Sequence, residues 1–268
     1  MYDFDSLYKK IKELKILNTK LYTNCFFFSD KLVELASLPS TRFIAGESFA
    51  ALAIKEKEFS RIFFWINNLN DVQKLLSLIK GQSEECFVIE LVGSESDVNI
   101  MKDRFMSSGA VCYAVLERWR AGSIRQPQSS DDINIRYSLI EKKDIKKAFS
   151  MLMETFDSKI SHLPSERELH KLYEQRLLFG AYHKSELVGT CCMENIGETG
   201  KYCYETAILR EYRGQGIGKR LKGYAWGQSP DAKVFTSWVA VENIASQKVN
   251  VALGLEKDGL ITVVLEYT

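Results

Sequence analysis

The sequence has almost no net charge and no long apolar run. Its 36 lysines and arginines against 35 acidic residues give a formal charge of +1, whereas a nucleic-acid-binding domain usually carries a strongly basic face. We therefore expect no nucleic-acid partner. Apolar runs such as 49–54 and 62–66 are far shorter than the roughly 20 residues that cross a bilayer. Since the N-terminal region also shows no apolar stretch followed by a small-residue cleavage site, we expect no membrane association and a cytoplasmic protein.

The patterns of a metal site are also missing. The six cysteines show no C-x-x-C spacing, and the three histidines do not cluster. In a reducing compartment such cysteines behave as small buried apolar residues. We expect no metal cofactor.

The composition allows two packed domains. Of the 268 residues, 46% are hydrophobic and 26% charged, and domains typically contain roughly 100–200 residues. Between 121 and 132 the pattern lapses into Gly, Ser, Pro, Gln and Asp, which is typical of a linker. We predict an N-terminal domain at 1–120, a linker at 121–132 and a second domain at 133–268.

Hydrophobic periodicity predicts an α/β protein in both halves. In the first half we expect helices at 4–14, 30–38, 71–79 and 98–106, and strands at 42–45, 49–54, 61–66, 86–92 and 111–119. In the second half we expect strands at 133–140, 179–183, 186–193, 202–209, 234–241 and 261–266, and helices at 142–156, 165–178, 217–226 and 245–253. Asn70 is a candidate N-cap for the helix after it, and Ser165 with Glu168 resembles a capping box.

The stretch 213–219 is the strongest local motif. Its glycines at 214, 216 and 218 remove side chains from a turn between a predicted strand and a predicted helix, so backbone N–H groups can approach an anion. A helix N-terminus adds unpaired N–H groups and a favourable dipole. The helix after the turn has Ile217, Leu221, Tyr224 and Ala225 as its apolar stripe, and Lys222 lies off that stripe.

Two better-known phosphate loops do not fit this stretch. The dinucleotide-binding fingerprint needs a further glycine where Lys219 or Leu221 stands. The P-loop needs glycine at Arg213 and Ser or Thr at Arg220. A phosphate cradle of another kind and an ordinary glycine-rich turn remain as alternatives.

The pattern Arg-x-x-Gly-x-Gly between a strand and a helix resembles the acyl-CoA-binding motif of GNAT-type N-acetyltransferases. The order of predicted strands and helices after residue 133 is similar to the GNAT fold. A second signature of that family, Asn243, Ser246 and Gly254-Leu255, stands at the expected spacing, with leucine in place of the usual aromatic residue. The resemblance implies a mixed central sheet in the second half.

The first half shows a weaker similarity. Its predicted order of elements repeats the later part of the second half, so it resembles a smaller, degenerate GNAT-like α/β domain. Asn67-Asn68-Leu69-Asn70 stands where the glycine loop would be, and we expect no coenzyme there. The whole chain resembles bacterial GNAT-like proteins with an extra N-terminal domain.

The resemblance also implies roles for individual residues. It implies acetyl-CoA as cosubstrate, held by Ile208, Leu209, Arg213, Gly214, Gln215, Gly216, Ile217, Gly218, Lys219, Asn243 and Ser246. A backbone N–H near Ile208 is the implied donor to the developing oxyanion. Glu205 is the candidate catalytic base. The family's frequent general acid is a tyrosine seven residues after Asn243, where this chain has Asn250; water or Tyr204 are alternatives for that proton.

We therefore expect an enzyme, an acyltransferase that moves an acetyl group from acetyl-CoA to a primary amine of a small molecule or peptide by direct attack. The alternative is an acyl-CoA-binding regulatory or sensory module with weak or no catalysis, which Asn250 would suit. The expected partners are acetyl-CoA and the amine acceptor, and the expected state is a monomer or homodimer.

Overall fold

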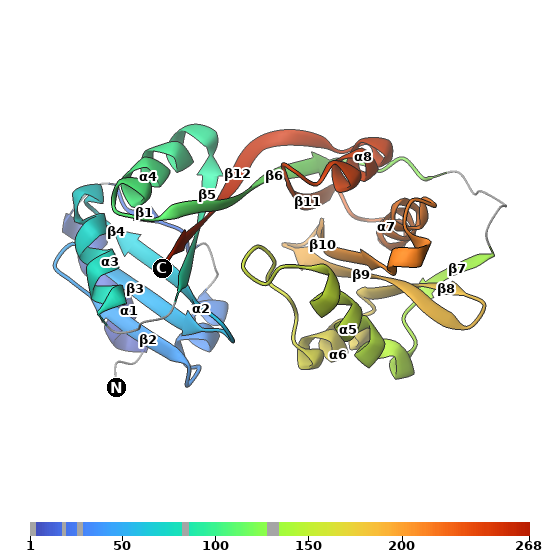
Figure 1. Cartoon of the computed structure of the whole chain (residues 1–268), viewed down its shortest axis with the longest axis horizontal. Helices are drawn as coiled ribbons and strands as arrows, with labels where there is room; N and C mark the ends of the chain where they lie inside the picture. The colour runs from blue at the N-terminus through green and yellow to red at the C-terminus, as the bar shows by residue number, and fades with distance from the viewer. Residues whose placement is uncertain (1–3, 18–19, 26–28, 82–85, 128–133) are drawn as a thin grey trace. The chain divides into compact units, whose positions relative to one another are not determined.

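The computed structural model describes residues 4–17, 20–25, 29–81, 86–127 and 134–268 (Figure 1). Contacts divide the chain into two compact units. We call the part up to Val115 together with Leu260–Thr268 the first unit, and Leu116–Gly259 the second unit. Each unit has its own buried apolar core.

The first unit is a mixed sheet with helices on both faces. Its elements are α1 (Phe4–Leu17), β1 (Tyr22–Thr23), α2 (Ser29–Ala36), β2 (Thr41–Ala45), β3 (Phe49–Lys55), β4 (Ser60–Ile66), η1 (Leu69–Asp71), α3 (Val72–Lys80), β5 (Phe87–Ser94), α4 (Glu95–Ser107), the start of β6 (Val111–Ala121) and most of β12 (Glu256–Tyr267). The strands β2, β3, β4, β5 and β12 lie in that order, and β4 and β5 run parallel. Alternate residues of β3 face opposite cores: Ala51 and Ala53 pack with α3 and α4, and Leu52 packs with α1.

Local capping explains where two helices of this unit begin. α4 begins at Glu95 rather than 98, because the Ser94 hydroxyl caps it by accepting from the Asp97 N–H at 3.3 Å. The prediction that Asn70 caps the helix after it is wrong, because the N-cap residue of α3 is Asp71. Asn68 accepts from the Asn70 N–H at 3.0 Å and starts the short η1, so α3 begins only at Val72.

The second unit contains the glycine loop in a mostly antiparallel sheet. Its further elements are β7 (Ile135–Leu139), η2 (Lys142–Asp144), α5 (Ile145–Thr155), α6 (Glu166–Glu174), β8 (Leu178–His183), β9 (Glu186–Ile196), β10 (Gly200–Ile208), η3 (Arg210–Tyr212), α7 (Ile217–Gly227), β11 (Val234–Ala240) and α8 (Ile244–Leu253). The strand order is β6-β11-β10-β9-β8-β7, with β10 and β11 parallel. Figure 1 shows α5 and α6 on one side of these strands and α7 and α8 on the other.

The predicted helix 165–178 is too long at its C-terminal end. The capping box is confirmed, since Ser165 accepts from the Glu168 N–H and Glu168 from the Ser165 N–H. The helix ends at Glu174, Arg176 adopts a positive φ of 60°, and Leu178 already begins β8. A short apolar run such as Leu177 to Phe179 has no periodicity that separates helix from strand.

The last strand connects the two units along the chain. Residues Leu260–Tyr267 of β12 pair antiparallel with β5 and therefore belong to the first unit. The domains 1–120 and 133–268 stay predictions. Of the predicted linker 121–132, residues 128–132 lie outside the described residues, whereas Arg125 donates its backbone N–H to the Leu253 carbonyl at 2.9 Å. That part of the segment is thus fixed against the end of α8.

Candidate active site

The glycine loop owes its conformation to two left-handed residues. Gly214 and Gly216 have φ of 78° and 74°, a region that costs a side-chain-bearing residue roughly 1–2 kcal/mol. A Cβ on Gly214 would meet nothing within 4 Å. Glycine is therefore required at this position by the left-handed backbone conformation and not by a lack of space. Gly216 is the N-cap of α7 and supplies no side-chain cap. The first N–H groups of α7 are therefore available to an anion.

Side chains of the loop bind its carbonyl groups. Arg213 donates through Nε to the Ile208 carbonyl at 2.9 Å, and Gln215 donates through Nε2 to the Glu211 carbonyl at 3.1 Å. Arg220 donates to the Gln215 carbonyl at 2.8 Å and to the Tyr137 hydroxyl at 3.0 Å. The loop's own side chains thus donate to its carbonyl groups, and the positive charge of the arginines stays near the N-terminus of α7.

A fork opens between the two parallel strands beside the loop. Pairing of β10 with β11 ends at Tyr202 opposite Thr236, whereas pairing of β10 with β9 continues to Ile208 opposite Gly189. The Leu209 N–H donates to the Val188 carbonyl of β9 at 2.9 Å. Because successive residues of a strand point their backbone groups to opposite sides, the Ile208 N–H is directed into the fork and the Leu209 N–H is not.

The second predicted motif lies at the start of α8. Asn243 is the N-cap of this helix, and its Oδ1 accepts from the Ser246 N–H at 3.0 Å. The structure thus brings Asn243 and Ser246 together as a helix cap. Their contact with the coenzyme stays a prediction, as do the binding roles of Ile217, Gly218 and Lys219.

Glu205 is a buried carboxyl group on β10, only 6% exposed. Its side chain is hydrogen-bonded to Ser161, in the segment between α5 and α6. Burial raises the pKa of Glu205 from its usual 4.5 to about 8, although the Ser161 hydrogen bond acts in the opposite direction. A carboxyl group with such a pKa can exchange a proton near neutral pH. The catalytic role of Glu205 stays a prediction.

Sequence reasoning missed a buried lysine in α7. Lys222 is 6% exposed, and its ammonium donates to the Ser237 hydroxyl at 2.9 Å and to Oδ1 of Asn250 at 2.8 Å. The expectation that Lys222 lies off the packed stripe is wrong, because α7 packs against α8 as well as the sheet and has a wider buried face. The sequence signal for this burial is Trp226, which is four residues further on, lies on the same face of the helix as Lys222 and is 1% exposed.

Tyr204 is a poor alternative for the missing general acid. Burial raises the pKa of its hydroxyl, which makes the proton harder to release.

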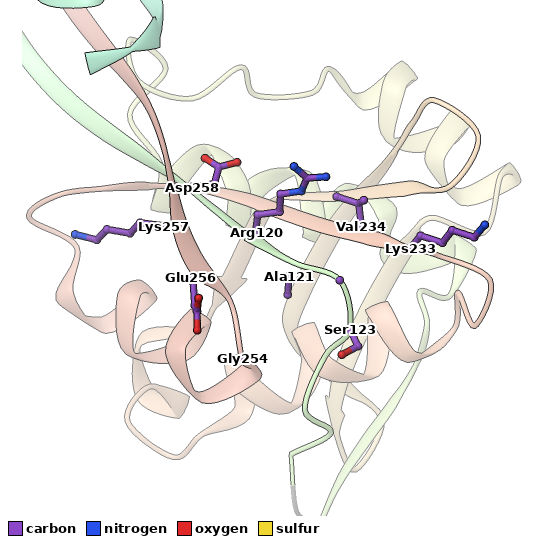
Figure 2. A pocket seen from close by; sticks show the side chains of 10 residues that line it. Arg120, Ala121, Ser123, Lys233, Val234, Gly254, Glu256, Lys257 and Asp258 are labelled. Carbon is purple, nitrogen blue, oxygen red and sulfur yellow. The ribbon is translucent and has the colours of Figure 1, made fainter. Parts of the chain in front are cut away.

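A separate hollow of about 630 Å³ lies elsewhere in the second unit (Figure 2). The ends of β6 and the starts of β11 and β12 line it, including Arg120, Lys233 and Asp258. Its lining includes none of the loop or fork residues, so we do not place chemistry there. Among the described residues, no group of three His, Cys, Asp or Glu could hold a metal ion. None of the described helices is both long and apolar enough to cross a membrane.

Comparison with known proteins identifies this part of the chain. Residues 145–254 match the model of the Acetyltransferase (GNAT) family. Similar solved structures include a GCN5-related N-acetyltransferase from Kribbella flavida (15% identity, 85% of this chain and 90% of that one, TM-score 0.62). A second similar structure is a GCN5-related N-acetyltransferase from Sphaerobacter thermophilus (11% identity, 97% of this chain and 90% of that one, TM-score 0.61).

A third similar structure is a tandem GNAT protein from the clavulanic acid biosynthesis pathway, solved without AcCoA (13% identity, 97% of this chain and 94% of that one, TM-score 0.60). The matched 97% of this chain includes the first unit, so the predicted GNAT-like fold of both halves is confirmed. No curated protein matches the chain in sequence.

Proposed function

We propose that the protein is an acyltransferase that moves an acetyl group from acetyl-CoA to a primary amine by direct attack. The match of residues 145–254 to the Acetyltransferase (GNAT) family supports acyl transfer. The observation that carries this proposal is Glu205, a buried carboxyl group with a raised pKa on the strand that lines the fork. A base in that place can take a proton from an amine at neutral pH.

The residues present fit an acyl-CoA. The α7 N-terminus with its left-handed glycines provides N–H groups for the pyrophosphate, and Arg213 and Lys219 add positive charge. The open edge of β10 provides the Ile208 N–H for an amide or carbonyl oxygen. Acetyl-CoA supplies the activated acyl group as a thioester.

The protein's own groups then have two tasks. Glu205 accepts the proton that the amine nitrogen loses as it bonds to the thioester carbon. The Ile208 N–H donates to the carbonyl oxygen as negative charge develops on it. The carbon–sulfur bond breaks, and the sulfur leaves with the electron pair.

The acceptor in this proposal is a small-molecule or peptide amine. Glu205 is hydrogen-bonded to Ser161, which lies in the segment between α5 and α6, so we place the acceptor on the face of the sheet that these two helices cover. All six cysteines lie among the described residues and none of them forms a disulfide, which fits a reducing compartment, and we propose a cytoplasmic activity.

The test combines binding and turnover. Acetyl-CoA at about 100 times its Kd should stabilise the folded protein by about 2.7 kcal/mol, which raises Tm by roughly 2–4 °C per kcal/mol at this chain length. Thiol release is then followed over a panel of small and peptide amines. Stabilisation with amine-dependent thiol release supports the proposal. Stabilisation without turnover across the panel supports the acyl-CoA-binding module instead, and no stabilisation contradicts both.

A further inference from the structure

Lys222 forms a buried polar cluster with Ser237 and Asn250. The three residues come from α7, β11 and α8, and the lysine ammonium is 2.9 Å from the Ser237 hydroxyl and 2.8 Å from the Asn250 Oδ1. It also lies 4.9 Å from the centre of the Trp226 ring. Three elements thus hold one ammonium group in the interior.

The cluster has more donors than acceptors. Among the described residues the Lys222 ammonium makes no ion pair with a carboxylate, although its charge acts to lower the pKa of Glu205. The ammonium has three N–H donors and two acceptors here. Asn250 is completely buried, and its amide nitrogen has no hydrogen-bond partner among the described residues. A buried cation with one N–H donor left over and a buried amide nitrogen without an acceptor are both costly, so the cluster is suited to receive an anion.

The cluster lies where the fork begins. Tyr202 and Thr236 are the last paired residues of β10 and β11, and Ser237 is the next residue of β11. Glu205 is on the same strand, β10, but is hydrogen-bonded to Ser161 on the α5 and α6 side. The carboxyl group and the ammonium therefore approach the fork from opposite faces of the sheet.

We propose that Lys222 donates a proton to the coenzyme thiolate when the acyl group leaves, with Ser237 and Asn250 as positioning residues. This inference rests on the proposed function. The nitrogen–carbon bond forms, the carbon–sulfur bond breaks, and the sulfur keeps the electron pair. Glu205 takes the amine proton, Lys222 supplies the proton that makes the thiol, and solvent returns one to the lysine.

Cys203 is the competing anion. This buried thiol lies on β10 just past the last paired residue, and its pKa is lowered by the hydrogen bond with Cys191, 3.5 Å away, and further by the Lys222 charge. A Cys203 thiolate would satisfy the ammonium without any coenzyme. The experiment must separate the two thiols.

The first measurement needs no variant. Binding of CoA and of desulfo-CoA, which lacks the thiol, is compared by calorimetry across a pH series, with ultraviolet absorbance reporting thiolate. The proposal expects CoA to bind more tightly, by about tenfold or more, with the preference growing as pH rises and thiolate absorbance appearing on binding. Equal affinities throughout would overturn it, as would a thiolate signal that is present without CoA and disappears in Cys203→Ser.

The second measurement uses Lys222→Met, which keeps the length and removes the charge. We expect retained stabilisation by acetyl-CoA, loss of the CoA preference, and a kcat lower by about 10²-fold or more. Lys222→Met/Asn250→Tyr should recover part of kcat, because tyrosine restores a proton donor. Unchanged kcat in Lys222→Met overturns the inference and leaves the proposed function intact, whereas a wild-type protein that does not bind acetyl-CoA contradicts the proposed function itself.

Discussion

At the residue scale, the proposed chemistry depends on two buried ionisable side chains. Glu205 has one hydrogen-bond partner and a pKa raised by burial, and Lys222 has two neutral partners. Burying such a group costs several kcal/mol when it is ionised away from water. Strongly perturbed carboxyl groups are accordingly common where protons are transferred.

Glu205 predicts a specific pH dependence of activity. A base with a pKa of about 8 is active only when deprotonated, so kcat/KM should rise as pH increases and level off above about 8. Glu205→Gln should lose that rise and lower kcat by about 10²–10⁴-fold. The exposed Glu198→Gln is the matched control and should leave the profile unchanged. A Glu205→Gln profile identical to wild type removes Glu205 from the mechanism.

The same group predicts a pH dependence of stability. The folded-state pKa of about 8 lies above the ordinary value of 4.5, so the folded protein holds the proton more tightly than the unfolded chain does. This contribution is fully present below about pH 4.5 and is lost as pH rises through about 8. Glu205→Gln removes the loss, so its free energy of unfolding relative to wild type should increase between pH 5 and 9 by on the order of a few kcal/mol, and its Tm relative to wild type should increase accordingly. A Tm difference independent of pH would contradict the assigned burial.

The role of Gly214 and Gly216 in the turn could be predicted from the sequence, whereas the burial of Lys222 could not. A glycine with positive φ reflects a local demand of the turn, which the spacing of Gly214 and Gly216 already expresses. The burial of Lys222 results from packing between α7, α8 and β11, which are separated in sequence. No periodicity within α7 contains that information.

At the scale of elements, the loop before α7 allows a matched test of the coenzyme site. Gly214 and Gly197 both have positive φ, at 78° and 57°, and a Cβ on either would meet nothing within 4 Å. Alanine at either position should therefore lower stability by a similar amount, about 1 kcal/mol. Only Gly214→Ala distorts the anion cradle, so it alone should weaken acetyl-CoA binding, by about tenfold or more. Thermal-shift titration of both variants measures this, and equal weakening would place the pyrophosphate elsewhere.

Local signals account for most of the predicted elements and also for the errors. The capping box of Ser165 and Glu168 could be predicted from sequence, because a hydroxyl and a carboxylate three residues apart satisfy two helix N–H groups. The overlong helix reflects Leu177 to Phe179, whose apolar side chains belong to a strand. The extent of β12 was missed because its pairing with β5 joins residues more than 160 positions apart.

At the scale of the whole molecule, the chain passes between the units twice. β6 begins in the first unit and ends paired with β11 in the second, and β12 leaves the second unit to pair with β5 in the first. The first unit therefore depends on residues distant in sequence from the rest of it, whereas the second unit is one continuous stretch. The last nine residues contribute Val263 and Leu265 to the core around α3 and α4.

Because of this arrangement, we predict that Leu→Ala at position 255 and at position 265 loosens different units, although the two positions are only ten residues apart. Leu255 is 2% exposed in the second unit's core, and Leu265 is 1% exposed in the first unit's core. Leu→Ala at a buried site costs about 2–5 kcal/mol. Hydrogen–deuterium exchange should show Leu265→Ala loosening peptides before Val115, and Leu255→Ala loosening peptides of 134–253. Acetyl-CoA should restore protection mainly in Leu255→Ala, because its proposed site lies in that unit. Loosening of the same peptides by both variants would contradict the assignment of the last strand to the first unit.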